Sequence, residues 1–519
     1  MKALDKEILR LALPSILANI TVPLVGLVDT AVAGHLHSAA GSGAEFIGGI
    51  SVGAMILNVI YWNFGFLRAS TGGLTAQAYG KSRRILPSEG LSTLGHASPK
   101  NGRFSGAPIP TLREGPVACD GRGRSERSER SSEEGSILRR ALKLALGISA
   151  ILLVLGWPLS KLSLLFRSAT PGVAILAAQY ILIRIWAAPA TLSLMALKGW
   201  FIGMQDSFSS MITDLTVNLV NIASSIILTL GIGGWQGLGF PGIALGTVIA
   251  QWTGFILALA ICRFRYGLSP RARKQAFLGT DTLKNEASCP KTGQNGHGVH
   301  DFLHLNADLF VRSLCMTGIY FGYTVLAARS GDVLLACANI MMNLLMIFSY
   351  FTDGFAYAGE ALTGRFIGER NPEMLRKAVG GTFRWSFGVA GSWIAVYLLA
   401  GLPMLRLMTD DPVVVDACRQ FLPWLALMPL IGCAAFTWDG VYIGATASKG
   451  IRNSMIWAVV AFFAVWFAGL LLSPGLFGTQ VPGNPAAIHL LLAAYFAHLA
   501  ARAVYLTATA ASIRVPEEL

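Results

Sequence analysis

Charged residues are scarce in this chain of 519 residues: only 13% are Asp, Glu, Lys or Arg, against about 25% in ordinary soluble domains. A soluble chain of this length would divide into several domains, and these charges are too few to cover their surfaces. The apolar share of 53% also excludes a disordered chain, and the composition is not that of a collagen or a coiled coil. The composition therefore predicts a membrane protein.

Cysteine is also scarce, and the seven that are present form no useful pattern. Most of them, such as Cys262, Cys337 and Cys433, lie inside apolar runs without the paired spacing of metal ligands. A disulfide framework and a zinc site are both excluded by this distribution. No metal or other cofactor is expected.

Long apolar stretches, in contrast, recur along the whole chain. A helix needs about twenty apolar residues to cross a bilayer. Stretches of this length predict twelve transmembrane helices, at 10–34, 47–79, 138–160, 173–200, 208–232, 241–263, 305–329, 334–363, 379–402, 413–440, 453–473 and 486–511. The first stretch has no small-residue cleavage site after it, so we interpret it as a helix that stays in the membrane rather than a signal peptide.

The basic residues are divided unequally between the loops. Odd-numbered loops contain only Lys161, Arg167, Arg329 and Arg406, whereas most other Lys and Arg residues lie in even-numbered loops and at the two ends. Lys and Arg concentrate on the cytoplasmic side of membrane proteins, so both termini are predicted to be cytoplasmic. The net charge of +13 then reflects orientation in the lipid bilayer, and no nucleic-acid partner is needed to explain it.

Two polar stretches interrupt the apolar pattern. Residues 82–136 combine Pro, Gly and Ser with a run of mixed charge and have no apolar period, so we predict a disordered cytoplasmic loop there. Residues 266–303 lie near the middle of the chain and are predicted to be a cytoplasmic linker. They separate an N-terminal six-helix lobe, residues 1–265, from a C-terminal six-helix lobe, residues 304–519.

The two halves contain matching phrases. Residues 199–207 (GWFIGMQDS) match residues 440–448 (GVYIGATAS), and residues 74–80 (LTAQAYG) match residues 362–368 (LTGRFIG). An even number of spans in each half makes the repeats parallel, with a substrate site expected between them. The predicted fold is therefore an all-α polytopic membrane protein of two pseudo-symmetric six-helix bundles.

Four phrases resemble the multidrug and toxic compound extrusion (MATE) family, in its DNA-damage-inducible branch. They are residues 11–17 (LALPSIL), 27–34 (LVDTAVAG), 353–368 (DGFAYAGEALTGRFIG) and 439–446 (DGVYIGAT). The resemblance covers nearly the whole chain except residues 82–136, where relatives have a short connection. It implies an exporter in the bacterial cytoplasmic membrane that exchanges small organic, often cationic, amphiphiles for protons or sodium by alternating access.

Asp29 is the leading candidate for ion coupling because it lies deep in the first span. An ionised carboxylate there costs about 2.5–3.5 kcal/mol on insertion scales, which suits a group that takes up and releases a proton. Pro14 removes a backbone hydrogen bond from the same helix and provides a place to bend. In the family, the matching aspartate and proline link protonation to bending of this helix. The alternative is a structural aspartate bonded to nearby hydroxyl or amide groups.

The fifth span places Asp214, Asn218 and Asn221 on one helical face. Archaeal relatives have a second coupling aspartate four residues after the position of Asn221, where this chain has Ser225. We therefore expect Asn218 and Asn221 to support ion coupling, with Asn221 as a hydrogen-bond partner of Asp29. Packing between helices is the alternative role of this face.

The eighth span carries Asp353 and Glu360 on one face, and Arg312 on the seventh span is expected to pair with one of them. These residues and Tyr320 are interpreted as a substrate or cation site in the C-terminal lobe, or as a buried ion pair that fixes packing. Other branches of the family bind sodium through a Glu on the seventh span, which is absent here. Proton coupling is therefore favoured over sodium.

Methionine and aromatic residues are concentrated between residues 341 and 351. Met342, Met346 and Tyr350 are candidates for a pocket that accepts varied lipophilic cations, since thioethers adapt in shape and rings attract cations. Packing or lipid contact is the alternative. Asp206, Asp439, Lys449 and Arg452 lie around the matching connections, where a gate or solvated loops are expected, and Arg68 and Arg502 are expected to extend from span ends.

Two other functions compete with drug export. A flippase for lipid-linked oligosaccharides shares the two-lobed plan but usually needs a strongly cationic cavity, which Asp29, Asp353 and Glu360 oppose. A multispanning membrane enzyme would need a metal-binding aspartate pair or a catalytic constellation. The chain has no Walker or hydrolase signature, and Asp410 and Asp411 lie in an outer loop. The sequence therefore favours a transporter over an enzyme.

Overall fold

The computed structural model describes residues 2–34, 36, 43–84, 121–162, 171–266, 299–409, 411–472 and 484–513. Twelve spans in these ranges are long and apolar enough to cross a membrane, as the sequence predicts. The first half contains α1 (Lys2–Gly34), α2 (Gly43–Asn63), α3 (Phe66–Arg84), α4 (Gly121–Lys161), α5 (Pro171–Arg184), α6 (Ala188–Gly203), α7 (Ser207–Leu230) and α8 (Phe240–Tyr266). The second half contains α10 (Val299–Ala328), α11 (Asp332–Gly368), α12 (Pro372–Met408), α13 (Pro412–Arg419), α14 (Leu422–Gly444), α15 (Ser448–Leu472) and α17 (Pro485–Thr509).

Two of the predicted spans are broken into two helices each. The second span consists of α2 and α3, which are separated at Phe64 and Gly65, and the fourth consists of α5 and α6, joined by the 3-10 turn Ile185–Ala187. Pro189 lies in the first turn of α6, where its missing N–H costs no hydrogen bond. The break before α3 later positions Arg68 at the site.

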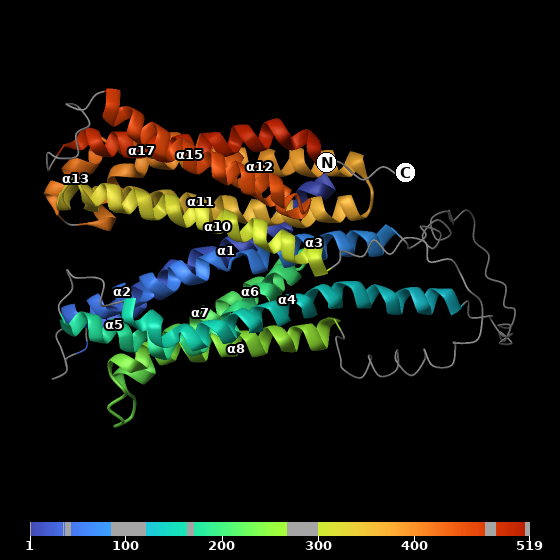
Figure 1. Ribbon diagram of the computed structural model, residues 1–519, viewed down its shortest axis with the longest axis horizontal. Helices are drawn as coiled ribbons and strands as arrows, with labels where there is room; N and C mark the ends of the chain where they lie inside the picture. Colours follow the sequence, from blue (N-terminus) through green and yellow to red (C-terminus); the bar gives the residue numbers. More distant parts are fainter. Residues whose placement is uncertain are drawn as a thin grey trace, which may run out of the picture.

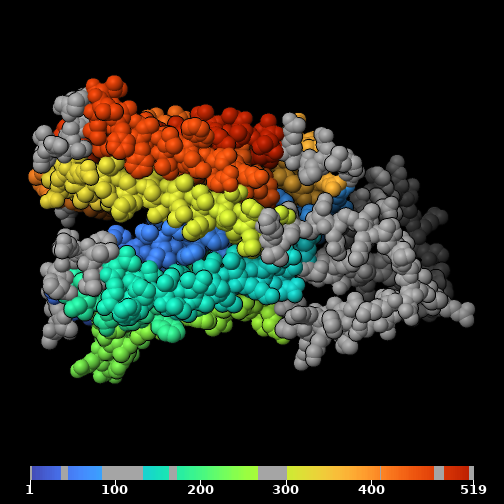
Figure 2. Space-filling model, viewed as in Figure 1, coloured from blue at the N-terminus to red at the C-terminus, as the bar shows by residue number. Residues whose placement is uncertain are grey.

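The helices form two bundles (Figure 1). Helices α1–α8 make one lobe and α10–α17 the other, and the lobes meet mainly where α11 contacts α1 and α3. Figure 2 shows the lobes separated by a notch at the left end of the view and in contact toward the right end. The start of α1 and the end of α17 lie toward the same end of the molecule, the right in Figure 1.

The internal repeat is visible in the backbone. Gln205 and Thr446, two residues after the matching glycines Gly203 and Gly444, both have positive φ angles of 61° and 54°. In each case the next amide donates back into the preceding helix, at 2.9 Å after Gln205 and 3.0 Å after Thr446. This is the Schellman arrangement that ends a helix sharply. The matching phrases therefore form the same turn in both lobes.

The matching glycines also make matching contacts. Gly199 lies against the backbone carbonyl of Arg68, and Gly440 lies against the backbone carbonyl of Ala356. A side chain at either glycine would collide with that carbonyl, so α6 approaches α3 closely, as α14 approaches α11. The sequence repeat thus corresponds to one repeated helix packing.

The lobes touch through a second pair of equivalent glycines. Gly80 on α3 and Gly368 on α11 lie against one another, and a side chain at either would overlap the backbone of the opposite helix. Nearby, Ala76 on α3 faces Gly364 on α11. Small residues allow membrane helices to approach closely, so these positions close one end of the interface between the lobes.

The predicted loop and linker are shorter than the sequence analysis expects. Helix α3 continues to Arg84 and α4 begins at Gly121, so residues 82–84 and 121–136 of the predicted loop are helical. The mixed-charge run is rich in Arg and Glu, which are good helix formers. Helix α10 begins at Val299, within the predicted linker. Residues 85–120 and 267–298 lie outside the described residues.

Candidate functional site

A cavity of about 260 Å³ lies between the lobes. The N-terminal lobe contributes Trp62 at the end of α2 and Arg68 near the start of α3, while the C-terminal lobe contributes α10, α11 and α14. Five residues that the sequence analysis assigns to a C-lobe polar site line this cavity: Arg312, Tyr320, Met346, Asp353 and Glu360. The site therefore lies between the lobes rather than within one of them.

Two further candidates are placed elsewhere. Met342 and Tyr350 are described by the structure but do not line this cavity. Met342 packs against the apolar core of the C-terminal lobe, and the backbone carbonyl of Tyr350 accepts a hydrogen bond from Asn19 Nδ2 at 3.4 Å. Met346 accepts a hydrogen bond from the Tyr320 hydroxyl, with 3.6 Å between oxygen and sulfur. Of the methionines in residues 341–351, only Met346 lines the cavity, and most of the other residues pack in the core of the C-terminal lobe.

Glu360 is neutralised across the lobe interface. Its carboxylate pairs with Arg68 at 3.0 Å, and the Arg68 guanidinium lies over the ring of Tyr357 at 4.3 Å. The side chain of Glu360 is fully buried, and its other oxygen points at Gly72, where a side chain would collide with it. The expectation that Arg312 pairs with Asp353 or Glu360 is wrong: Glu360 pairs with Arg68 of the opposite lobe, and Arg312 pairs with Asp439.

Arg312 instead belongs to a cluster of three charges in the C-terminal lobe. Arg312 Nη2 donates to Asp439 Oδ2 at 2.7 Å, and Arg502 Nη2 donates to the same oxygen at 2.5 Å. Arg502 comes from α17, is fully buried and lies over the ring of Phe436 at 5.8 Å. Arg312 keeps 20% of its side chain exposed. We call Arg312, Asp439 and Arg502 the arginine cluster.

The arginine cluster corrects two expectations. Asp439 is a buried residue of the cavity wall rather than a residue of a gate or solvated loop, and Arg502 lies inside the lobe rather than extending from a span end. The sequence contained a signal for this arrangement: Asp439 and Arg502 both lie inside apolar stretches, and ionisable residues within spans usually face the protein interior and pair there. What the sequence does not give is the choice of partner.

Asp353 is the remaining acid of the cavity, and it differs from the other two. It has no hydrogen bond or ion pair to any residue in the described ranges, and its side chain is only half-buried. Gly440 contacts the backbone of Ala356, so Asp439 lies near the level of Ala356 on α11. Asp353 precedes Ala356 by three residues, about 4.5 Å along the helix axis. A free carboxylate therefore lies close to the arginine cluster.

Asp29 lies in a separate polar site inside the N-terminal lobe. It is buried, Ser225 of α7 lies within hydrogen-bonding reach, and one carboxylate oxygen has no partner among the described residues. No Lys or Arg in the part of the chain that the structure describes forms an ion pair with Asp29. The hydroxyl of Ser225 is its hydrogen-bonding neighbour, and Arg184 of α5 lies near enough to act on its charge without forming an ion pair.

The side-chain amides of α7 do not bond to Asp29 as expected. Asn221 Nδ2 donates to Thr247 Oγ1 of α8 at 3.1 Å, and Ser225 Oγ donates to Asn221 Oδ1 at 3.4 Å. Ser225 thus stands between Asn221 and Asp29, and the expectation of a direct bond from Asn221 is wrong. Asn218 Nδ2 donates to Thr21 Oγ1 of α1 at 2.6 Å. Helix α7 therefore holds α1 at two levels.

Asp214, the third residue of that face, has a different partner. Its carboxylate accepts a hydrogen bond from Lys198 Nζ of α6 at 2.6 Å. This pair lies away from Asp29, because Asp214 precedes Ser225, the residue of α7 beside Asp29, by about three helical turns. Asp214 is thus part of a structural ion pair in the N-terminal lobe.

Helix α1 connects the two lobes. Its first half, including Ala12 and Ile16, packs against α11 at Gly354, whereas its second half packs against α7 around Thr21 and Asp29. Pro14 lies inside this continuous helix, in the part that contacts α11. A proline in a helix interior leaves one carbonyl without its usual donor and weakens the helix at that turn. Pro14 therefore weakens α1 at its contact with the opposite lobe, and a second proline, Pro23, lies between that contact and Asp29.

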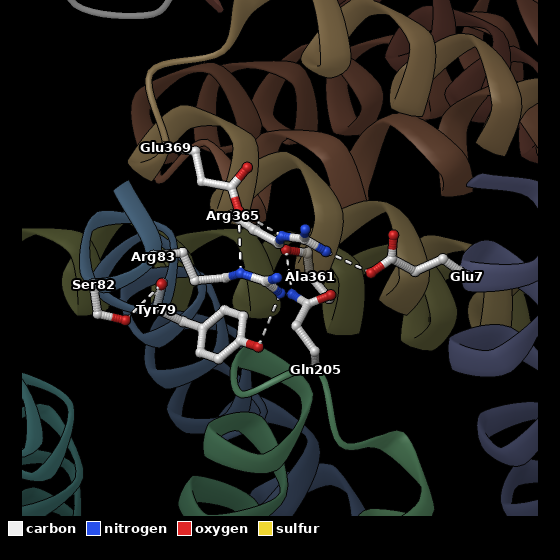
Figure 3. Close-up of polar contacts among 8 residues, drawn as sticks. All are labelled: Glu7, Tyr79, Ser82, Arg83, Gln205, Ala361, Arg365 and Glu369. Carbon is white, nitrogen blue, oxygen red and sulfur yellow. Dashed lines mark hydrogen bonds and ion pairs between the residues drawn. The ribbon is translucent and has the colours of Figure 1, made fainter. Parts of the chain in front are cut away.

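The closed end of the lobe interface carries a polar network (Figure 3). Arg365 of α11 bridges Glu7 of α1 at 2.5 Å and Glu369 at 2.8 Å, and Arg83 of α3 reaches Glu369 at 3.7 Å. Gln205 Nε2 also crosses the interface and donates to the carbonyl of Ala361 at 2.7 Å. We call Glu7, Arg83, Arg365 and Glu369 the latch.

The latch differs from the residues that the sequence analysis considered for a gate. Asp206 accepts a hydrogen bond from the amide of Ser209 and so caps the start of α7. Arg452 pairs with Asp308 at 2.6 Å, within the C-terminal lobe. Glu7 and Arg365 had no signal in sequence, since they are far apart in the chain and appear as ordinary charges at span ends.

The comparisons with known proteins decide the family. The family model described as MatE matches residues 129–227 and 309–474. The chain is 32% identical over 458 residues to the DNA damage-inducible protein F of Escherichia coli (strain K12). The aligned residues make up 88% of this chain and 84% of that protein. The chain belongs to the MATE family. It resembles the DinF branch, as the sequence phrases indicate.

Other MATE proteins are more distant. A probable multidrug resistance protein NorM of Xanthomonas axonopodis pv. citri is 22% identical over 463 residues, which is 89% of this chain and 84% of that protein. A solved structure described as the outward-facing conformation of a multidrug resistance MATE family transporter of the MOP superfamily has a TM-score of 0.71 at 15% identity. The superposition covers 98% of this chain and 96% of the chain in that structure.

These findings establish the class of the protein. It is a multi-pass membrane protein of a multidrug efflux transporter family, with the all-α fold of twelve spans that its solved relatives share. The relatives are transporters and not enzymes, so the enzyme alternative of the sequence analysis is excluded.

Proposed function

We propose that this MATE protein is a secondary active antiporter that exports small organic, often cationic, amphiphiles in exchange for protons by alternating access. The observation that carries the proposal is that two acids without an ion pair in the described residues lie in two separate sites. Asp353 lines the cavity between the lobes and Asp29 is buried in the N-terminal lobe, and neither forms an ion pair within the described ranges. One site suits a cation carried by a large molecule, and the other suits a proton.

The cavity is suited to bind the organic substrate. Trp62 and Tyr320 provide aromatic faces, with ring centroids 5.9 Å apart, and Met346 provides an adaptable thioether. Asp353 supplies the charge that orients a cationic group, since the other two cavity acids are already paired. The formal charges around the cavity nearly cancel, which disfavours a pyrophosphate-linked oligosaccharide as substrate.

The Asp29 site is suited to carry the proton. Removing an ionised carboxylate from water without a basic partner is costly, so protonation and hydration of Asp29 must change together. Protonation also changes which hydrogen bonds Asp29 makes with α7. Because α1 continues from this site to its contacts with α11, a change in its hold on α7 is transmitted to the lobe interface through the weak turn at Pro14.

Proton and substrate then compete through conformation rather than for one atom. Each needs only to favour a different arrangement of the lobes, because binding linkage is reciprocal. A proton that moves inward across the membrane supplies about 2.3 kcal/mol per 100 mV. Sodium is the alternative coupling ion. Within the described residues no group of His, Cys, Asp or Glu side chains that could hold a metal ion gathers around Asp29, and this favours the proton.

The direction of the cycle follows from the charges at the helix ends. The latch end also carries Lys81 and Arg84 at the end of α3 and Arg263 and Arg265 at the end of α8. By the positive-inside rule this end is cytoplasmic, with both termini on that side of a bacterial inner membrane. The structure then corresponds to a state that is closed to the cytoplasm, with the notch of Figure 2 facing outward.

The test is dye export from a strain that lacks its own pumps, compared between the wild-type protein and Asp29→Asn. We expect ethidium export to require the proton gradient, to persist when sodium is replaced by potassium, and to vanish in Asp29→Asn. Asp416→Asn, on exposed α13, is the matched control and should export normally. Normal export by Asp29→Asn would refute the coupling role, and export driven by sodium alone would refute proton coupling.

A further inference from the structure

The arginine cluster contains more positive than negative charge. Two guanidinium groups share one oxygen of Asp439, while the other oxygen of Asp439 is buried without a partner. Arg502 is fully buried, and its Nε and Nη1 atoms have no partner among the described residues. One positive charge is therefore uncompensated by protein groups within the cluster. Asp353 lies near enough to act on both guanidinium groups but bonds to neither, so a further anion in direct contact would stabilise the cluster.

Arg312 is the member of the cluster that a ligand can reach. It lines the cavity, keeps 20% of its side chain exposed, and uses only Nη2 for Asp439. A guanidinium group has five N–H donors in a planar fork, which matches the geometry of a carboxylate. The exposed part of Arg312 is thus able to receive an anionic group from the cavity side while the Asp439 contact is maintained.

The same cavity contains an acid whose charge the neighbouring arginines balance only at a distance. Asp353 has no partner in the described ranges and lies about one helical turn from the level of Asp439. The third charged pair of the wall, Arg68 with Glu360, is internally balanced. The cavity therefore has one free carboxylate and one cluster with an excess positive charge, both accessible from the same space.

We propose that this two-point arrangement selects zwitterionic amphiphiles, whose carboxylate binds Arg312 while their cationic group binds Asp353. The inference rests on the proposed export function and specifies its substrate class. A purely cationic molecule gains the contact with Asp353 but meets the excess positive charge of the arginine cluster. A zwitterion compensates both charges at once, so the cluster contributes specificity by repulsion as well as by attraction.

The aromatic wall fits the rest of such a molecule. Trp62 and Tyr320 lie on the side of the cavity near Met316 and Met346, and none of these residues is charged. A flat ring system is able to lie against them while its charged groups reach the two sites. This arrangement predicts that charge placement decides affinity when the ring system is held constant.

Two matched dyes test the proposal. Tetramethylrhodamine is zwitterionic, and its methyl ester has the same ring system and cationic charge without the carboxylate. Binding of both is measured by fluorescence polarisation with the purified full-length protein, and export of both is measured in proteoliposomes with an imposed proton gradient. We expect the acid to bind about tenfold more tightly than the ester, the size expected for a hydrogen-bonded charge pair.

Arg312→Gln should remove this preference, because the acid loses its partner while the ester loses a repulsive charge. Arg502 still pairs with Asp439 in this variant, so folding should be retained. Arg329→Gln, an exposed arginine just beyond the end of α10, is the matched control and should keep the wild-type preference. Arg312→Lys should retain a weakened preference, since the charge remains without the planar fork.

Three outcomes are decisive. Preference for the acid in the wild-type protein and its loss in Arg312→Gln supports the proposal. Equal or tighter binding of the ester by the wild-type protein overturns the zwitterion site but leaves drug export intact, because the ester is still transported. If neither dye nor ethidium is exported, the proposed function itself fails and this inference fails with it.

Discussion

Lys198 and Asp439 occupy equivalent positions in the two lobes, immediately before the matching glycines Gly199 and Gly440, yet they carry opposite charges. Lys198 is neutralised by one acid, Asp214, and Asp439 by two arginines. The repeated backbone therefore does not impose repeated chemistry. Each lobe neutralises its own charge at this position. Asp29 and Asp353 differ from both, because neither forms an ion pair in the part of the chain that the structure describes.

The largest predicted effect is the difference in the free energy of unfolding between variants of Asp439, which is paired, and of Asp29, which forms no ion pair with a described residue. Asp439→Asn leaves two guanidinium groups in the C-terminal lobe without their shared anion, which should cost about 3–5 kcal/mol. Asp29→Asn removes no ion pair and should leave the free energy of unfolding nearly unchanged. Thermal unfolding of both variants in the same detergent measures the contrast. Similar melting temperatures would show that the arginine cluster is not a structural unit.

A second prediction concerns the equivalent glycines at the lobe interface, where the two lobes have the same backbone packing. Gly80→Leu and Gly368→Leu each place a side chain against the backbone of the opposite lobe. Overpacking of this kind costs about 1–3 kcal/mol, so both variants should shift the protein away from the closed arrangement to a similar extent. Spin labels at Phe264 and Lys377, exposed on opposite lobes, report the separation of that end.

The control for this experiment is Gly388→Leu, because nothing lies within contact of a side chain at that position. It should leave the distance distribution unchanged. A shift in only one of the two glycine variants would contradict the assignment of Gly80 and Gly368 as equivalent contacts.

A third prediction separates the two acids of α11. Asp353→Asn should weaken binding of the cationic dyes about tenfold with little change in stability, since Asp353 forms no hydrogen bond or ion pair with a described residue. Glu360→Gln should instead lower the melting temperature, because it leaves Arg68 in the interface without its anion. Isothermal titration and thermal unfolding of both variants check this. Unchanged dye affinity in Asp353→Asn would remove that residue from the binding site.

The smallest predicted effect concerns the latch. Arg365→Gln breaks the contacts with Glu7 and Glu369, which are only partly buried, so a cost of about 1 kcal/mol or less is expected. The same pair of spin labels should show a modest increase in the open population. High salt should produce a similar change in the wild-type protein. Arg406→Gln, exposed at the opposite end of α12, should have no effect.

Span number, fold and family could all be predicted from the sequence, because twenty-residue apolar stretches and repeated glycine phrases are local signals. The break at Phe64 and Gly65 and the helical start of α4 were missed, since an apolar or charged run does not mark such boundaries. Candidate site residues were found by type, as acids within apolar stretches. Their partners were not, because the pairing of Arg68 with Glu360 and of Arg502 with Asp439 depends on how distant helices pack.

The most direct test of the account is proton release on substrate binding. Ethidium added to the purified wild-type protein in weakly buffered detergent solution should release protons, because we propose that substrate and proton favour different conformations and that Asp29 holds the proton. Asp29→Asn should bind ethidium with no release. Release of the same number of protons by Asp29→Asn would contradict the account, because the exchanged proton would then be held elsewhere.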